Sequence, residues 1–137
     1  NQKMEKSLAS YINGYNFSVL EIAITDWIDA YELSTEASSY ITDNEHLQSP
    51  EIEAFLASIT SLIYQGLKIA GVEQFHPEVG NLYQTEIGVT LVESIPAKDP
   101  QHIGKIAETR RAGWKTRLPE DKSNQQVIRE ALVVVYN

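Results

Sequence analysis

The spacing of the apolar residues changes at Gly71, and this change limits the chain to a fold with two different parts. Before Gly71, apolar side chains recur every three or four residues, as on amphipathic helices. After Gly71 they alternate with polar residues, as in residues 87–91 and 127–136, which is typical of short strands. We therefore expect an α+β fold with a helical region at 1–71 and a small all-β domain at 72–137.

The charge changes at the same point. Residues 1–71 contain ten acidic and three basic residues, whereas residues 72–137 contain nine acidic and eight basic residues. Such an asymmetry is typical of two parts that face different surroundings. The basic residues of the second part include a run with only Glu108 among them: Lys105, Arg110, Arg111, Lys115 and Arg117.

The first part predicts two main helices. One is expected at residues 17–41, after a short helix at residues 2–12 that ends at Asn13-Gly14. The other has Ser49 as its N-cap, Pro50 at its first position and Gly71 just past its end. Glu51 and Glu53 lie near the positive end of its dipole.

These two helices have more apolar surface than they can bury against each other, because Phe55, Leu62 and Ile69 widen the apolar edge of the second one. Helices from a second copy are the simplest cover. We therefore expect a dimeric four-helix bundle, two helices from each subunit, with an interface made by Leu20, Ile24, Trp27, Tyr31, Leu56, Ile59, Ile63 and Leu67.

In the second part, residues 103–111 and 114–118 predict a tight hairpin around Ala112-Gly113. Residues 119–126 predict a polar loop, and residues 127–136 a closing strand on which Arg129 shares a face with Ala131. Arg129 therefore either pairs within the domain or contacts a partner. Trp114 is either a core ring or an exposed anchor, and the core is favoured.

Several function classes are disfavoured. The net charge of −8 argues against nucleic-acid binding. The chain contains no cysteine, and His46, His76 and His102 are scattered, so neither a metal nor another cofactor is expected. No apolar run approaches the roughly 20 residues of a membrane helix, so no membrane contact is expected and the cytoplasm is the expected compartment.

No enzyme motif was found either. Gly-x-Ser-x-Gly and a phosphate-binding glycine loop are both absent from the sequence. Four acidic residues follow one side of the first helix and are interpreted as a solvated face: Asp26, Asp29, Glu32 and Glu36. A small hydrolase is therefore the weakest of the function classes considered.

Four segments, in order, resemble the C-terminal half of GrpE, the nucleotide exchange factor of DnaK-type chaperones. They are residues 63–73, which end in Gly-Val-Glu, residues 92–94, residues 104–114 and the closing segment 127–135. The Phe-Asp-Pro-x-x-His stretch usual in that family is missing, since Tyr83-Gln84-Thr85 and Gly88 stand there and Phe75-His76-Pro77 falls earlier. The sequence therefore resembles a divergent member.

The resemblance implies a co-chaperone whose β-domain binds the ATPase domain of a DnaK-type chaperone and promotes ADP release. The residues expected to contact the chaperone are Lys105, Arg110, Arg111, Gly113, Trp114, Lys115 and Arg129. The alternative is a dimeric adaptor with a GrpE-like β-module that binds another protein and has no exchange activity.

Overall fold

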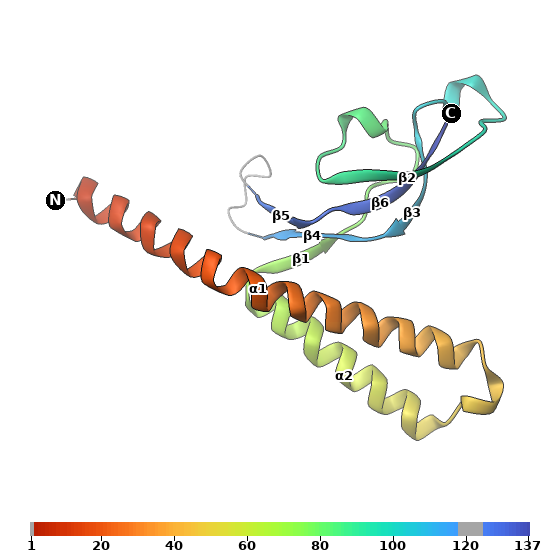
Figure 1. Cartoon of the computed structure of the whole chain (residues 1–137), viewed down its shortest axis with the longest axis horizontal. Coiled ribbons are helices and arrows are strands. Elements are labelled where there is room, and N and C mark those ends of the chain that lie inside the picture. The colour runs from red at the N-terminus through yellow and green to blue at the C-terminus, as the bar shows by residue number, and fades with distance from the viewer. Residues whose placement is uncertain (1, 118–124) are drawn as a thin grey trace. The chain divides into compact units, whose positions relative to one another are not determined.

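The computed structural model describes residues 2–117 and 125–137, and the side chains of these residues except 6–20. The chain divides into two compact units, Asn1–Ala70 and Gly71–Asn137. The first is helical and the second contains two small sheets of short strands, so the expected α+β class is confirmed (Figure 1).

Helix α1 is one continuous helix, Gln2–Thr42, and the predicted break at Asn13-Gly14 is wrong. An isolated glycine in a helix costs only about 1 kcal/mol relative to alanine, so the surrounding hydrogen-bonded turns carry the helix across it. After the short 3₁₀ helix η1 (Glu45–Leu47), helix α2 (Pro50–Ile69) returns alongside α1 (Figure 1).

The ends of α2 are as predicted. The Ser49 hydroxyl accepts a hydrogen bond from the backbone N–H of Ile52 at 3.5 Å, and Pro50 occupies the first turn. At the other end, Gly71 adopts a φ of 83°, a left-handed conformation that other residues rarely adopt. Gly71 therefore ends the helix and turns the chain into the first strand.

The contact between α1 and α2 combines apolar packing with one hydroxyl pair. Ile28 and Leu67 are buried, and the rings of Tyr31 and Tyr64 lie 5.6 Å apart. Between the helices, the Thr60 hydroxyl donates to the Ser34 hydroxyl at 2.9 Å. Each hydroxyl also bonds a carbonyl of its own helix, Ser34 to Tyr31 and Thr60 to Leu56, so the pair adds a contact between the helices without being needed to satisfy either group.

The described residues of the second unit form two three-stranded sheets. In the first sheet all pairs are antiparallel, and its order is β1 (Val72–Phe75), β4 (Gly113–Thr116), β5 (Val127–Arg129). The order of the second sheet is β2 (Val89–Ile95), β6 (Ala131–Tyr136), β3 (Ile106–Arg111). Its central strand β6 is parallel to β2 and antiparallel to β3. The short 3₁₀ helices η2 (Tyr83–Thr85) and η3 (Pro100–His102) lie in the connections.

The predicted hairpin of β3 and β4 is wrong, because these consecutive strands belong to different sheets. A two-residue hairpin of the favoured type needs positive φ values in its turn, and Gly113 is not among the described glycines with positive φ. At Ala112 the chain passes from the second sheet into the first.

The predicted closing strand is also divided. The chain leaves the first sheet after β5, passes Glu130, and enters the second sheet as β6. Strand β6 is central in that sheet, and Val133, Val134 and Val135 are all buried, as expected of a strand covered on both faces. Arg129 and Ala131 therefore lie in different sheets, and the expectation that they share a strand face is wrong.

The strands of the β unit pack closely around Gly113. Ile106, Val133 and Val135 form a buried cluster, and Trp114 is fully buried. A Cβ atom at Gly113 would lie 2.3 Å from the ring of Phe75 and 2.9 Å from the backbone nitrogen of Ala131. Because glycine has no side chain, β1, β4 and the start of β6 can approach one another here.

Most of the predicted loop at 119–126 lies outside the described residues.

Candidate partner-binding surfaces

The basic residues predicted to contact a partner do not form one patch on one hairpin. Arg110 and Arg111 end β3 in the second sheet, whereas Lys115 lies on β4 and Arg129 on β5 in the first sheet. Lys105 precedes β3. The structure therefore distributes the predicted cations over both sheets.

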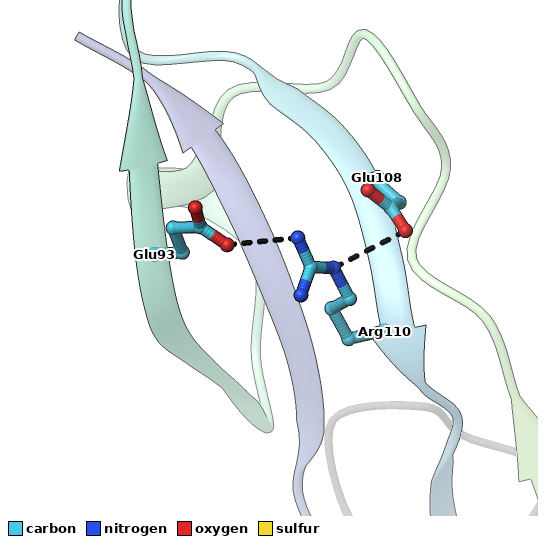
Figure 2. A network of polar contacts seen from close by, with 3 residues as sticks. All are labelled: Glu93, Glu108 and Arg110. Atoms are coloured by element: carbon cyan, nitrogen blue, oxygen red, sulfur yellow. Dashed lines mark hydrogen bonds and ion pairs between the residues drawn. The ribbon is translucent and has the colours of Figure 1, made fainter.

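Arg110 is held by two carboxylates of its own sheet. Figure 2 shows its guanidinium between Glu93 on β2 and Glu108 on β3. Arg110 Nη2 lies 2.8 Å from Glu93 Oε2, and Arg110 Nε lies 3.2 Å from Glu108 Oε1. All three side chains are about half exposed, and together they carry one net negative charge. This Arg110 cluster would not attract an acidic surface as an isolated arginine would.

Lys115 is likewise occupied within the unit. Its Nζ atom lies 3.6 Å from Glu73 Oε1, on the strand paired with β4, and 5.7 Å from the centre of the Phe75 ring. The Lys115 side chain is only 22% exposed. It therefore contributes to the packing of the first sheet as well as to the surface charge.

The remaining predicted contact residues differ in accessibility. Arg117 is exposed, and within residues 2–117 and 125–137 neither Arg117 nor Lys105 forms an ion pair. Arg111 and Arg129 are partly buried. Trp114 is 0% exposed, so the favoured core role is the one observed and its ring is not available to a partner.

A groove of about 380 Å³ lies in the β unit, and the sequence did not predict it. Its lining comes from separate segments and combines apolar with charged side chains: Phe75, His76, Pro77, Glu78, Asn81, Thr85, Glu86, Ile87, Lys115, Gln125 and Val127. Lys115 was predicted from the sequence as a contact residue, and Thr85 and Phe75-His76-Pro77 entered the comparison with GrpE, but nothing in the sequence indicated that these residues lie together. The other segments meet there through strand pairing, which the sequence does not reveal.

The predicted dimer-interface residues differ in how far the single chain buries them. Ile24 and Leu67 are already buried in the single chain, and the half-buried ones are Tyr31, Leu56, Ile59 and Ile63. Trp27 is 49% exposed. The side chain of Leu20 lies outside the described residues.

A second apolar stripe on α2 is more exposed than the predicted one. It follows alternating steps of three and four, the spacing of a coiled-coil seam, and we call it the α2 seam: Ile52, Phe55, Ile59, Leu62, Gly66 and Ile69. Phe55 and Leu62 are each about two-thirds exposed, and Ile69 is 86% exposed. The ring of Trp27 would lie 3.6 Å from a Cβ at Gly66, so α1 adds this ring beside the seam.

In the described parts of the chain, no three His, Cys, Asp or Glu side chains gather in a way that would hold a metal ion. The helices described there include none with the length and apolarity needed to cross a membrane.

We expect the Arg110→Gln variant to lose less than about 1 kcal/mol of unfolding free energy at low salt, because exposed ion pairs are weak. The difference from wild type should vanish near about 1 M NaCl, where the charges are screened. Urea unfolding at the two salt concentrations measures both values. Arg117→Gln is the matched control, and its unfolding free energy should show no salt-dependent loss. An equal loss in both variants would show that the ion pairs of the Arg110 cluster do not stabilise the fold.

A scan against protein-family models and a search of curated proteins found no match to this chain.

Proposed function

We propose that this chain is a dimeric nucleotide exchange factor that binds the ATPase domain of a DnaK-type chaperone and promotes ADP release. The observation that carries the proposal is the passage at Gly71 from α2, with its exposed seam, directly into a small β unit. This order of elements is the one that the GrpE-like segments of the sequence imply. The proposal assigns dimerisation to the helices and chaperone binding to the β unit.

The α2 seam supports the dimer. Burying one large apolar side chain contributes about 1.5–3 kcal/mol. In each copy the seam contains four exposed apolar side chains, with exposed fractions from 49% to 86%: Ile52, Phe55, Leu62 and Ile69. Pairing two seams around a two-fold axis would produce a four-helix bundle with α1 of each copy, and it would also cover the half-exposed Trp27.

The proposed activity requires no bond to be made or broken by this chain. An exchange factor needs to bind the open form of the nucleotide cleft more tightly than the closed form. The contacts to ADP then weaken and ADP leaves faster, and by the same coupling ATP binding releases the factor. In this proposal the β unit supplies the surface that contacts the chaperone.

The alternative function, an adaptor without exchange activity, is favoured by one observation. Glu93 and Glu108 surround Arg110, and their negative charges are unfavourable for binding an acidic surface of the chaperone. The exchange proposal expects such a surface to bind at Arg110. In the exchange proposal the approach to an acidic surface therefore depends on the other basic residues, including the exposed Arg117.

The two functions are separated by stopped-flow release of a fluorescent ADP from a DnaK-type chaperone, with and without this protein. The exchange proposal expects faster release. Replacing both Lys105 and Arg117 by glutamine removes two cations that form no ion pair within residues 2–117 and 125–137, and it should reduce the acceleration. Unchanged release, with or without binding to the chaperone, would overturn the exchange proposal and support the adaptor.

A further inference from the structure

A third stripe, on α1, is exposed and has a different composition from the α2 seam. It follows steps of four, three, four, three and four residues: Ile22, Asp26, Asp29, Leu33, Glu36 and Tyr40. We call it the α1 outer face. At 3.6 residues per turn, it lies roughly half a turn from Ile24 and Tyr31, on the side of α1 that points away from α2.

The apolar members of this face are strongly exposed: Ile22 is 76% exposed, Leu33 67% and Tyr40 63%. Carboxylates occupy the positions between them, where a coiled-coil seam normally carries apolar side chains. The second half of α1, residues 20–42, contains five acidic residues and neither lysine nor arginine. The α1 outer face is thus apolar and negatively charged along its whole described length.

A second copy of this chain is a poor cover for such a face. Pairing two α1 outer faces would bring carboxylates against carboxylates within an apolar contact, and like charges there are destabilising. A neutral apolar helix would bury Asp26 and Glu36 without offering them an opposite charge, which is also unfavourable. A helix that presents apolar residues flanked by lysine or arginine satisfies both parts of the face.

From this charge complementarity we propose that the α1 outer face binds a basic amphipathic helix of another protein. The apolar side chains of that helix pack on Ile22, Leu33 and Tyr40, and its cations pair with Asp26 and Glu36. This inference does not rest on the exchange function or on the α2 seam, because the face lies on a different side of the helical unit.

The test is isothermal titration calorimetry of the full chain with a synthetic helical peptide of leucine and lysine that has all its leucines on one face. The wild type should bind it saturably. Neutralising two acids of the face, in the Asp26→Asn/Glu36→Gln variant, should weaken binding about five- to tenfold, as expected for two solvent-exposed ion pairs. The control Glu45→Gln/Glu53→Gln removes the same number of charges elsewhere in the helical unit.

The apolar contribution is tested with two leucines of equal exposure. Leu33→Ser should weaken peptide binding several-fold, whereas Leu62→Ser, on the α2 seam, should leave it unchanged per chain. No binding by the wild type, or equal losses in both charge variants, would overturn the proposal. It would also be overturned if Leu33→Glu changed the sedimentation coefficient, since the face would then contact a second copy.

Discussion

The Leu62→Glu variant should sediment at the mass of one chain under conditions where the wild type sediments at twice that mass. Leu62 lies in the middle of the α2 seam and is 67% exposed in the single chain. In a two-fold dimer each copy would bury this position, so the substitution would bring two carboxylates into an apolar contact. Breaking a buried contact in this way costs several kcal/mol, which is enough to dissociate a micromolar dimer.

The matched control is Leu33→Glu on the α1 outer face, because Leu33 is also 67% exposed in an exposed helical stripe. It should leave the dimer intact. Circular dichroism should show equal helix content in both variants, since glutamate is a good helix former. A wild-type chain that is monomeric at micromolar concentration, or a Leu62→Glu variant that stays dimeric, would show that the α2 seam is not the interface.

The Gly113→Ala variant should destabilise the β unit by about 1–3 kcal/mol, the usual cost of overpacking a core. The added Cβ would lie 2.3 Å from the ring of Phe75 and 2.9 Å from the backbone nitrogen of Ala131, so both the ring and β6 would have to shift. Urea unfolding followed by tryptophan fluorescence measures the loss, because Trp114 is fully buried in this unit.

Two further variants isolate the cause. Phe75→Leu makes room for the added methyl group, so Gly113→Ala should cost less in the Phe75→Leu background than in the wild type. Gly80→Ala is the comparison: no atom lies within 4 Å of its Cβ, but its φ is 95°, so it is destabilised through backbone strain alone. Phe75→Leu should not relieve that strain. If Gly113→Ala unfolds like the wild type, the proposed close packing around Gly113 is wrong.

The sequence predicted well those features that depend on neighbouring residues. The ends of α2 follow from Ser49, Pro50 and Gly71, each of which acts within one helical turn. The change from helices to strands after Gly71 also follows from local periodicity. The continuity of α1 through Asn13-Gly14 was missed because the cost of one glycine is small compared with the hydrogen bonds of a 41-residue helix.

The missed features depend on pairing between distant residues. Neither the partner of β3 nor that of β4 is encoded in residues 103–118 alone, because β6 and β1 are far from them in sequence. For the same reason, the carboxylates around Arg110 were invisible: Glu93 lies on a strand 17 residues away. On α2 the sequence displayed both apolar stripes, but only the packing of α1 decided which of them stays exposed.

The crossing of the chain between sheets at Ala112 and Glu130 constrains how the β unit can come apart. Strand β3 of the second sheet continues directly into β4 of the first sheet, and β5 of the first sheet continues directly into β6 of the second. Local unfolding of one sheet would therefore also displace strands of the other sheet, to which its own strands are directly connected. Partial opening of this unit is suppressed, and whatever surface it offers to another molecule is presented as one piece or not at all.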